Sequence, residues 1–253
     1  MQSGSLRYIF IADSHLSDPE STESFFSMLD CISSRLLKME KGQRPALVFL
    51  GDIFELWIAI SGYETESHCR FLSWCRKYKE EFPVYFIEGN HEFFVSSRHK
   101  GDFSRCTADF IRKDEFVFLH GDGVNLTDWK YRSLRILLRN PVTAFLLYLF
   151  SGTGGTFLAE KIRKGLKNTN LENKKYFPAA FMVKRACSLL KKDNGILVAG
   201  HFHDTHILHA VSSSRKIFTL PAWNQTAGLT GFLFSDGKLV IDSWYKLLNN
   251  NEK

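Results

Sequence analysis

Five short apolar runs along the chain predict five buried β-strands. Each run has four or five residues and is bounded by glycine or other turn-forming residues, as expected of strands that are covered on both faces. The runs occupy residues 8–12, 46–50, 84–87, 116–119 and 196–199. Apolar side chains recur at helical spacing over residues 21–41 and 64–79, which lie between these runs. Alternating strands and helices of this kind predict a layered α/β fold with a largely parallel sheet.

The rest of the chain departs from this alternation. Residues 102–112 are expected to form a short helix, and Ser21 or Thr22 is expected to cap the helix at 21–41. Residues 128–192 contain helical patterns and no convincing strand, which indicates a helical insertion within a single domain of residues 1–253. Four strands are then expected at 205–211, 216–220, 228–234 and 238–245, forming a second, mostly antiparallel sheet.

Polar residues follow each of the five apolar runs. Ligands of open α/β sheets bind beyond the carboxyl ends of the strands, so we expect these polar side chains to meet at one place. The candidates are Asp13, His15, Asp52, Asn90, His120, His201 and His203.

Carboxylate and amide oxygens mixed with imidazole nitrogens suit Mn, Fe or Zn better than Mg or Ca alone. Seven ligands are too many for one ion and about right for two. Two ions roughly 3.5–4 Å apart can activate a water and stabilise both the attacking and the leaving oxygen of a displacement at phosphorus. Asp52 lies between the other motifs in sequence and is the natural candidate to span both ions.

Composition and charge narrow the choice of partners. The formal net charge is +6, which permits nucleotides, phospholipid head groups or nucleic acid as partners. The five cysteines are scattered and form no C-x-x-C pair, which favours a reducing compartment. No secretory signal is visible, and the longest apolar run, residues 142–150, is shorter than the ~20 residues that cross a bilayer.

The helical insertion has two interpretations. Its apolar faces could simply pack on the core. Alternatively, they could line a groove for acyl chains while its lysine and arginine side chains lie at an anionic membrane surface.

The order of the five motifs, D-x-H, GD, GN-H-E, H-G-D and GH-x-H, resembles the calcineurin-like metallophosphoesterases. The resemblance implies an α/β/β/α sandwich with two mixed sheets and a helical lid. It also implies one metal held by Asp13, His15, Asp52 and His203, and a second held by Asp52, Asn90, His120 and His201. His91 would then lie beside the leaving group as a general acid, with Asp52 and His91 the catalytic residues.

Residues 51–58, Gly-Asp-Ile-Phe-Glu-Leu-Trp-Ile, and 120–123, His-Gly-Asp-Gly, resemble one branch of that superfamily, the UDP-2,3-diacylglucosamine hydrolases of lipid A biosynthesis. This resemblance implies cleavage of the substrate's pyrophosphate to UMP and 2,3-diacylglucosamine 1-phosphate. Further implications are two divalent ions, expected to be Mn²⁺, and peripheral attachment to the cytoplasmic face of the inner membrane. Many members of the branch carry Arg where this chain has His91.

The same resemblance suggests which residues would contact substrate. The candidates are Trp57, Asp122, Arg163, Lys164, Lys167, Lys174 and Lys175. Trp57 could equally be a core anchor beneath the active-site loop.

Three other functions remain open at this point. A metallophosphodiesterase or pyrophosphatase acting on another nucleotide or phospholipid would use the same ligands. A nuclease is less favoured, because the basic residues lie beside apolar helices and not in an aromatic-interleaved strand groove, so no nucleic acid partner is expected. A non-enzymatic scaffold would be expected to have lost ligands. No obligate protein partner is indicated.

Overall fold

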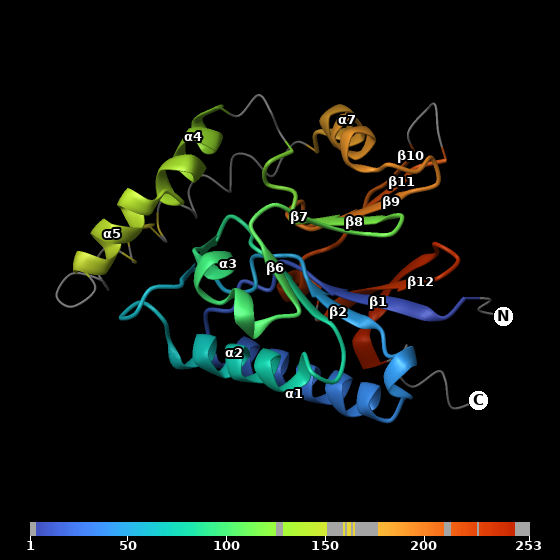
Figure 1. The fold of residues 1–253 in the computed structure, drawn as a ribbon, viewed down its shortest axis with the longest axis horizontal. Coiled ribbons are helices and arrows are strands. Elements are labelled where there is room, and N and C mark those ends of the chain that lie inside the picture. Colours follow the sequence, from blue (N-terminus) through green and yellow to red (C-terminus); the bar gives the residue numbers. More distant parts are fainter. Residues whose placement is uncertain are drawn as a thin grey trace.

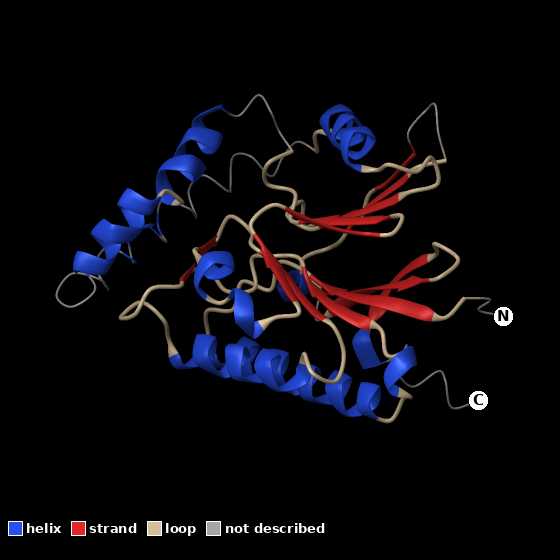
Figure 2. Cartoon of the chain, in the orientation of Figure 1, coloured by secondary structure: helices blue, strands red, loops and turns tan. Residues whose placement is uncertain are grey.

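Two β-sheets lie face to face with helices on their outer sides (Figure 1). The structure, a computed structural model, describes residues 4–124, 129–150, 159, 161–162, 164, 177–209, 214–226 and 228–245. The layers run helix, sheet, sheet, helix, as Figure 2 shows by colour. The α/β class and the sandwich architecture that the sequence predicts are therefore confirmed.

The first sheet contains six strands and the second contains five. Across the first sheet the order is β13 (Leu239–Ser243), β12 (Leu229–Phe234), β1 (Leu6–Ile11), β2 (Ala46–Phe49), β4 (Val84–Ile87) and β6 (Arg105–Thr107). Across the second sheet it is β10 (Ile207–His209), β11 (Lys216–Thr219), β9 (Ile196–Ala199), β8 (Phe116–Leu119) and β7 (Phe110–Lys113). A separate pair consists of β3 (Trp57–Ile58) and β5 (Glu92–Phe93).

Helices cover the outer faces of the two sheets (Figure 2). The first sheet is covered by α1 (Pro19–Leu37) and α2 (Glu66–Tyr78), and the second by α7 (Ala179–Leu189). The remaining helices are α3 (Val95–Arg98), α4 (Trp129–Leu138) and α5 (Pro141–Phe150). Short 3₁₀ turns occur at Lys41–Gln43, Lys100–Asp102 and Trp223–Gln225.

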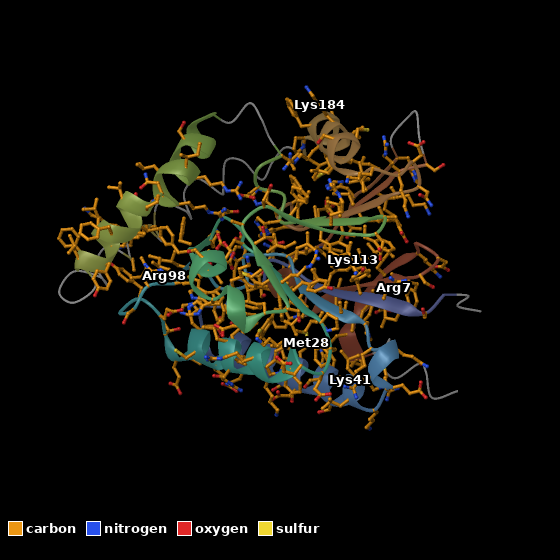
Figure 3. All side chains as sticks on the ribbon, viewed as in Figure 1. Arg7, Met28, Lys41, Arg98, Lys113 and Lys184 are labelled. Atoms are coloured by element: carbon orange, nitrogen blue, oxygen red, sulfur yellow. The ribbon has the colours of Figure 1, made fainter. Side chains whose placement is uncertain are left out.

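Three apolar layers hold the sandwich together, and side chains fill the space between the sheets (Figure 3). Along β1, Tyr8 and Phe10 face the second sheet, whereas Ile9 and Ile11 face the helices. Strands buried on both faces need apolar residues at every position, which is why the five runs show no alternation. The third layer joins the second sheet to α7 through Met182 and its neighbours.

All five apolar runs form strands, with β1, β2 and β4 parallel to one another and β8 parallel to β9. They are divided between the two sheets, so the polar ends meet across the sandwich and not along one sheet. The expectation that all four C-terminal strands form one second, mostly antiparallel sheet was wrong. Antiparallel β12 and β13 extend the first sheet beside β1, whereas β10 and β11 complete the second.

Two local predictions were also wrong. Residues 102–112 contain β6 and β7, which carry the chain from the first sheet to the second. Their half-buried, three- and four-residue strands are too short to show a clear period of two. Helix α1 begins earlier than expected, because Asp18 caps it by accepting a hydrogen bond from the Ser21 amide and Pro19 fits the first turn.

The region predicted to be a helical insertion has two parts in the structure. Helix α7 packs on the second sheet through Met182, Ala186 and Leu189, so it completes the sandwich. Helices α4 and α5 stand to one side of the sheets (Figure 1), and Leu147 of α5 is buried against the main core. Residues 151–158, 160, 163 and 165–176 of the predicted insertion lie outside the described residues. In the part of the chain that the structure describes, no helix is both long and apolar enough to cross a membrane.

Candidate metal centre

The seven predicted ligands lie together at the carboxyl ends of the five central strands. Asp13, His15 and His203 form one group, and Asp52, His120 and His201 form another; within each group one ligand atom per residue lies within 4.8 Å of the others. The Oδ1 atom of Asn90 is 3.2 Å from His120 Nε2, so Asn90 joins the second group. The two groups correspond to the two ligand sets that the motif order implies.

Backbone pairing continues past the strands and brings the ligand loops together. The amide of Asp13 donates to the Gly51 carbonyl at 3.1 Å, and the amide of His15 donates to the Asp52 carbonyl at 2.9 Å. Each loop turns sharply at its ligand. Left-handed backbone angles, with φ between 44° and 70°, occur at Asp13, His15, Asp52, His201 and His203. Such angles are uncommon outside glycine and cluster at functional sites, where surrounding contacts must hold them.

The first group is compact and buried. His203 Nε2 lies 3.3 Å from Asp13 Oδ1 and 3.3 Å from His15 Nε2. The other oxygen of Asp13, Oδ2, accepts a hydrogen bond from the His201 amide at 2.8 Å. Because β1 belongs to the first sheet and His201 and His203 follow β9 of the second, this group joins the two sheets.

Asp52 is the centre of the second group. Its Oδ2 lies 3.4 Å from His120 Nε2 and 3.8 Å from His15 Nε2, so this carboxylate reaches both groups. His120 Nδ1 is 2.6 Å from the Leu50 carbonyl oxygen and must carry a proton to make that hydrogen bond. Its Nε2 is therefore the atom that faces the centre.

A buried carboxylate, Glu92, holds the Asp52 loop and the Asn90 loop in place. Glu92 accepts hydrogen bonds from the amides of Asp52 at 2.8 Å, Ile53 at 2.7 Å and Gly89 at 2.7 Å. Burial, together with the charge of Asp52, raises the pKa of Glu92 to about 8. The sequence placed Glu92 in a motif without assigning it this structural role.

The protonation states suit cation binding. Burial lowers the pKa of His15 to about 3 and that of His201 to about 4, which leaves both imidazoles neutral. Burial acts to raise the pKa of Asp13 and Asp52, but the neighbouring histidines outweigh it and hold both pKa values below the usual range. For His120 burial acts to lower the pKa, but Asp52 outweighs it and raises the pKa to about 10, so a cation must displace a proton there.

These residues fit two divalent cations. Asp13 Oδ1 and His15 Nδ1 are buried and make no hydrogen bond among the described residues. A buried carboxylate oxygen without a hydrogen bond is costly unless a cation compensates for the lost hydration. The mixture of carboxylate, amide and imidazole donors is the one expected for first-row transition metals.

His91 adjoins both groups. Its Nδ1 is 2.6 Å from the Glu55 carbonyl oxygen, which directs Nε2 toward Asp52 Oδ2 at 3.9 Å. The rings of His91 and His15 pack edge to face with centroids 4.7 Å apart. His91 is thus held at the rim of the cation site with one nitrogen facing it.

The structure describes three of the seven predicted substrate-binding residues. Trp57 is fully buried, stacks on His68 and donates from Nε1 to Glu64 at 3.0 Å, so it is the core anchor in this structure. Asp122 is buried and paired with Arg135 of α4, its Oδ2 lying 3.0 Å from Arg135 Nε. Lys164 is exposed. Four candidates lie outside the described residues: Arg163, Lys167, Lys174 and Lys175.

Comparisons with known proteins agree with this geometry. The family model described as calcineurin-like phosphoesterase matches residues 6–205. A UDP-2,3-diacylglucosamine hydrolase of Psychromonas ingrahamii is 29% identical over 68% of this chain and 68% of its own length. A protein of the same name from Shewanella baltica is 28% identical over 84% of this chain and 88% of its own length. Another from Blochmanniella pennsylvanica is 26% identical over 86% of this chain and 88% of its own length.

Proposed function

The chain belongs to the calcineurin-like phosphoesterase family, and on that premise we propose that it hydrolyses the pyrophosphate of UDP-2,3-diacylglucosamine. The products would be UMP and 2,3-diacylglucosamine 1-phosphate, a step of lipid A biosynthesis. The observation that carries the proposal is a two-group cation site next to an apolar helical pair, in a chain similar to hydrolases of that name.

The apolar pair consists of α4 and α5. Large apolar side chains on it are exposed among the residues that the structure describes: Ile136, Leu137, Val142, Phe145, Leu146, Tyr148, Leu149 and Phe150. Extended apolar surfaces on a folded chain usually mark interaction sites. This one suits the acyl chains of a nucleotide-linked glycolipid. From the same surface we propose that the protein works peripherally at an anionic membrane surface. The cytoplasmic face of the inner membrane is proposed as part of the lipid A function and does not follow from the apolar surface.

We assign the cofactor as two divalent cations, with Mn²⁺ proposed because imidazole and oxygen donors are mixed. Asp13, His15, Asp52 and His203 would hold one cation, and Asp52, Asn90, His120 and His201 the other. When bound, the pair would supply Lewis-acid activation of a water and charge neutralisation at the phosphoryl oxygens.

The chain's own side chains orient the metal ligands and donate a proton to the leaving group. In the proposed reaction a water oxygen bonds to the α-phosphorus and releases a proton to solvent, as the bond from that phosphorus to the bridging oxygen breaks. The bridging oxygen leaves on the 1-phosphate. His91 in its imidazolium form donates the Nε2 proton to this leaving group, because the Glu55 carbonyl holds Nδ1 and fixes the ring. Glu92 keeps the Asp52 and Gly89 amides in place throughout.

The test is UMP release from UDP-2,3-diacylglucosamine in detergent with Mn²⁺, beside bis(p-nitrophenyl) phosphate as a generic diester. UMP release that disappears with EDTA supports the proposal. Turnover of the diester without UMP release would support phosphoesterase activity and reject this substrate. Another nucleotide or phospholipid substrate would then be favoured.

Two substitutions test the residue roles. His91→Ala is expected to lower kcat for UMP release by ~10²–10⁴-fold, the usual contribution of a general acid, and to remove the loss of rate on the alkaline side of the pH profile, where a general acid is deprotonated. His209→Ala is the matched control, because His209 is an exposed histidine on β10. Unchanged turnover and pH dependence in His91→Ala would reject the acid role. Normal turnover and metal content in Asp52→Ala would reject the whole site.

A further inference from the structure

Two arginines at the C-terminal end of α4 connect this helix to the loops of the metal centre. Arg135 and Arg139 are four residues apart, so they project from the same side of a helix. The guanidinium groups converge on one acceptor, the Ala108 carbonyl, which accepts from Arg135 Nη2 at 3.0 Å and from Arg139 Nη1 at 3.3 Å. Ala108 lies in the turn between β6 and β7, where the chain passes from one sheet to the other. We call these two residues the arginine pair.

Arg139 contacts the loop of the first sheet that carries Asn90. Its Nη2 donates to the Gly89 carbonyl and, at 3.3 Å, to the Glu92 carbonyl. The same atom lies 3.6 Å from Glu88 Oε2, a carboxylate whose residue is 2% exposed. One guanidinium thus holds a carbonyl at each end of the segment 89–92, which carries Asn90 and His91.

Arg135 contacts the loop of the second sheet that carries His120. Its Nε lies 3.0 Å from Asp122 Oδ2, and Asp122 is 6% exposed. A buried carboxylate depends on its partner, because taking it out of water is costly unless it is paired. The planar guanidinium can contact several oxygens in fixed directions, whereas a lysine ammonium is a single point charge.

The arginine pair therefore spans the same gap between the sheets that the second ligand group spans. Asn90 comes from the first sheet and His120 from the second, and their side chains are 3.2 Å apart. We propose that Arg135 and Arg139 are positioning residues that hold the Asn90 and His120 loops in register, and so set the cation affinity of the second ligand group. This role rests on the two-cation site and does not require the lipid substrate.

The test measures metal binding directly. Purified protein is stripped with EDTA and titrated with Mn²⁺, and free Mn²⁺ is read by electron paramagnetic resonance. Arg139→Gln is expected to weaken binding of one of the two ions by ~10–100-fold, as loss of outer contacts to metal ligands usually does, and to leave the other ion unchanged. Arg139→Lys, which keeps the charge but lacks the fixed planar arrangement of donors, should fall between Arg139→Gln and the wild type.

The control is Arg7→Gln on β1, because Arg7 makes an exposed ion pair with Asp114 at 3.7 Å, near the end of the strand opposite Asp13. If folded Arg139→Gln binds both ions with wild-type affinity, the proposal is overturned, even if the Tm of the variant is lower. A residue with a merely structural role would lower the Tm and leave the Mn²⁺ affinity unchanged. If Arg139→Gln does not fold, Arg139→Lys decides in the same way. If Arg139→Gln binds Mn²⁺ more weakly and the wild type releases no UMP, the positioning role of the arginine pair is supported and the proposed substrate is rejected.

Discussion

Adding one methyl group at Gly89 should disable the metal centre. A Cβ at this position would lie 2.2 Å from Asp52 Oδ1 and 2.6 Å from the Asp52 amide nitrogen. Non-bonded atoms involving carbon prefer roughly 3.5 Å, so Gly89→Ala requires a displacement of about 1 Å between the two loops. Asp52 cannot yield freely, because its amide donates to Glu92 and its Oδ1 accepts from the His91 amide at 2.9 Å.

The size of the effect follows from that displacement. A misplacement of about 1 Å typically costs on the order of 10²-fold in rate, and displaced ligands weaken metal binding by ~10–100-fold. We therefore expect Gly89→Ala to lower kcat/KM for a generic phosphodiester by about 100-fold and to weaken Mn²⁺ binding. Overpacking of this kind should also cost about 1–3 kcal/mol of unfolding free energy.

The assay is steady-state hydrolysis of bis(p-nitrophenyl) phosphate together with Mn²⁺ titration. Gly101→Ala is the matched control, because a Cβ there meets nothing within 4 Å. If Gly89→Ala kept its activity and Mn²⁺ affinity within threefold of the wild type, the close approach of the Gly89 and Asp52 loops would not be needed for the site.

Three further predictions concern stability. Stripping the cations with EDTA should lower the Tm by about 5–10 °C for each ion that was present at 100 times its Kd. Such an ion contributes ~2.7 kcal/mol of binding free energy to the folded state, and each kcal/mol changes the Tm by ~2–4 °C. A calorimetric Tm that is the same with and without EDTA would contradict cation binding to the folded chain. Phe118→Ala, at a fully buried position between the sheets, should cost about 3–5 kcal/mol in urea denaturation, and a loss below about 1 kcal/mol would argue against that core. Glu64 accepts a hydrogen bond from His99 and raises the His99 pKa, so the stabilisation by this pair is complete below the unfolded pKa of about 6.5 and is lost as pH rises through the folded pKa. Glu64→Gln should flatten that part of the profile of unfolding free energy against pH, and an unchanged profile would refute the assignment.

The sequence was sufficient to predict the five central strands and the meeting of the polar side chains that follow them, because both depend on local signals. A strand covered on both faces is apolar at every position, as in residues 116–119, and a polar residue directly after it must lie at the sheet edge. Sheet membership was not predictable in this way. Whether β12 pairs with β1 or with β11 depends on contacts between residues more than two hundred positions apart, such as Phe232 with Ile9.

The supporting residues of the site were harder to find for the same reason. Glu92 and the arginine pair bind backbone groups, and a backbone amide or carbonyl carries no signature in the sequence. The spacing of Arg135 and Arg139 on one helix face was visible, but their acceptors, including the Ala108 carbonyl, are defined only once the sheets are assembled. The buried position of Trp57 likewise follows from its packing on His68 and Phe71.

Each ligand group draws side chains from both sheets, and this has a consequence for reading genetic data. A cation held by Asp13 and His203, or by Asp52 and His201, is a cross-link between the two halves of the sandwich. A substitution that removes a ligand therefore reduces the amount of intact protein in a cell as well as the rate per molecule. Loss of growth in such a mutant reports on catalysis only after the protein level has been measured, and metal starvation should mimic the same loss in the wild type.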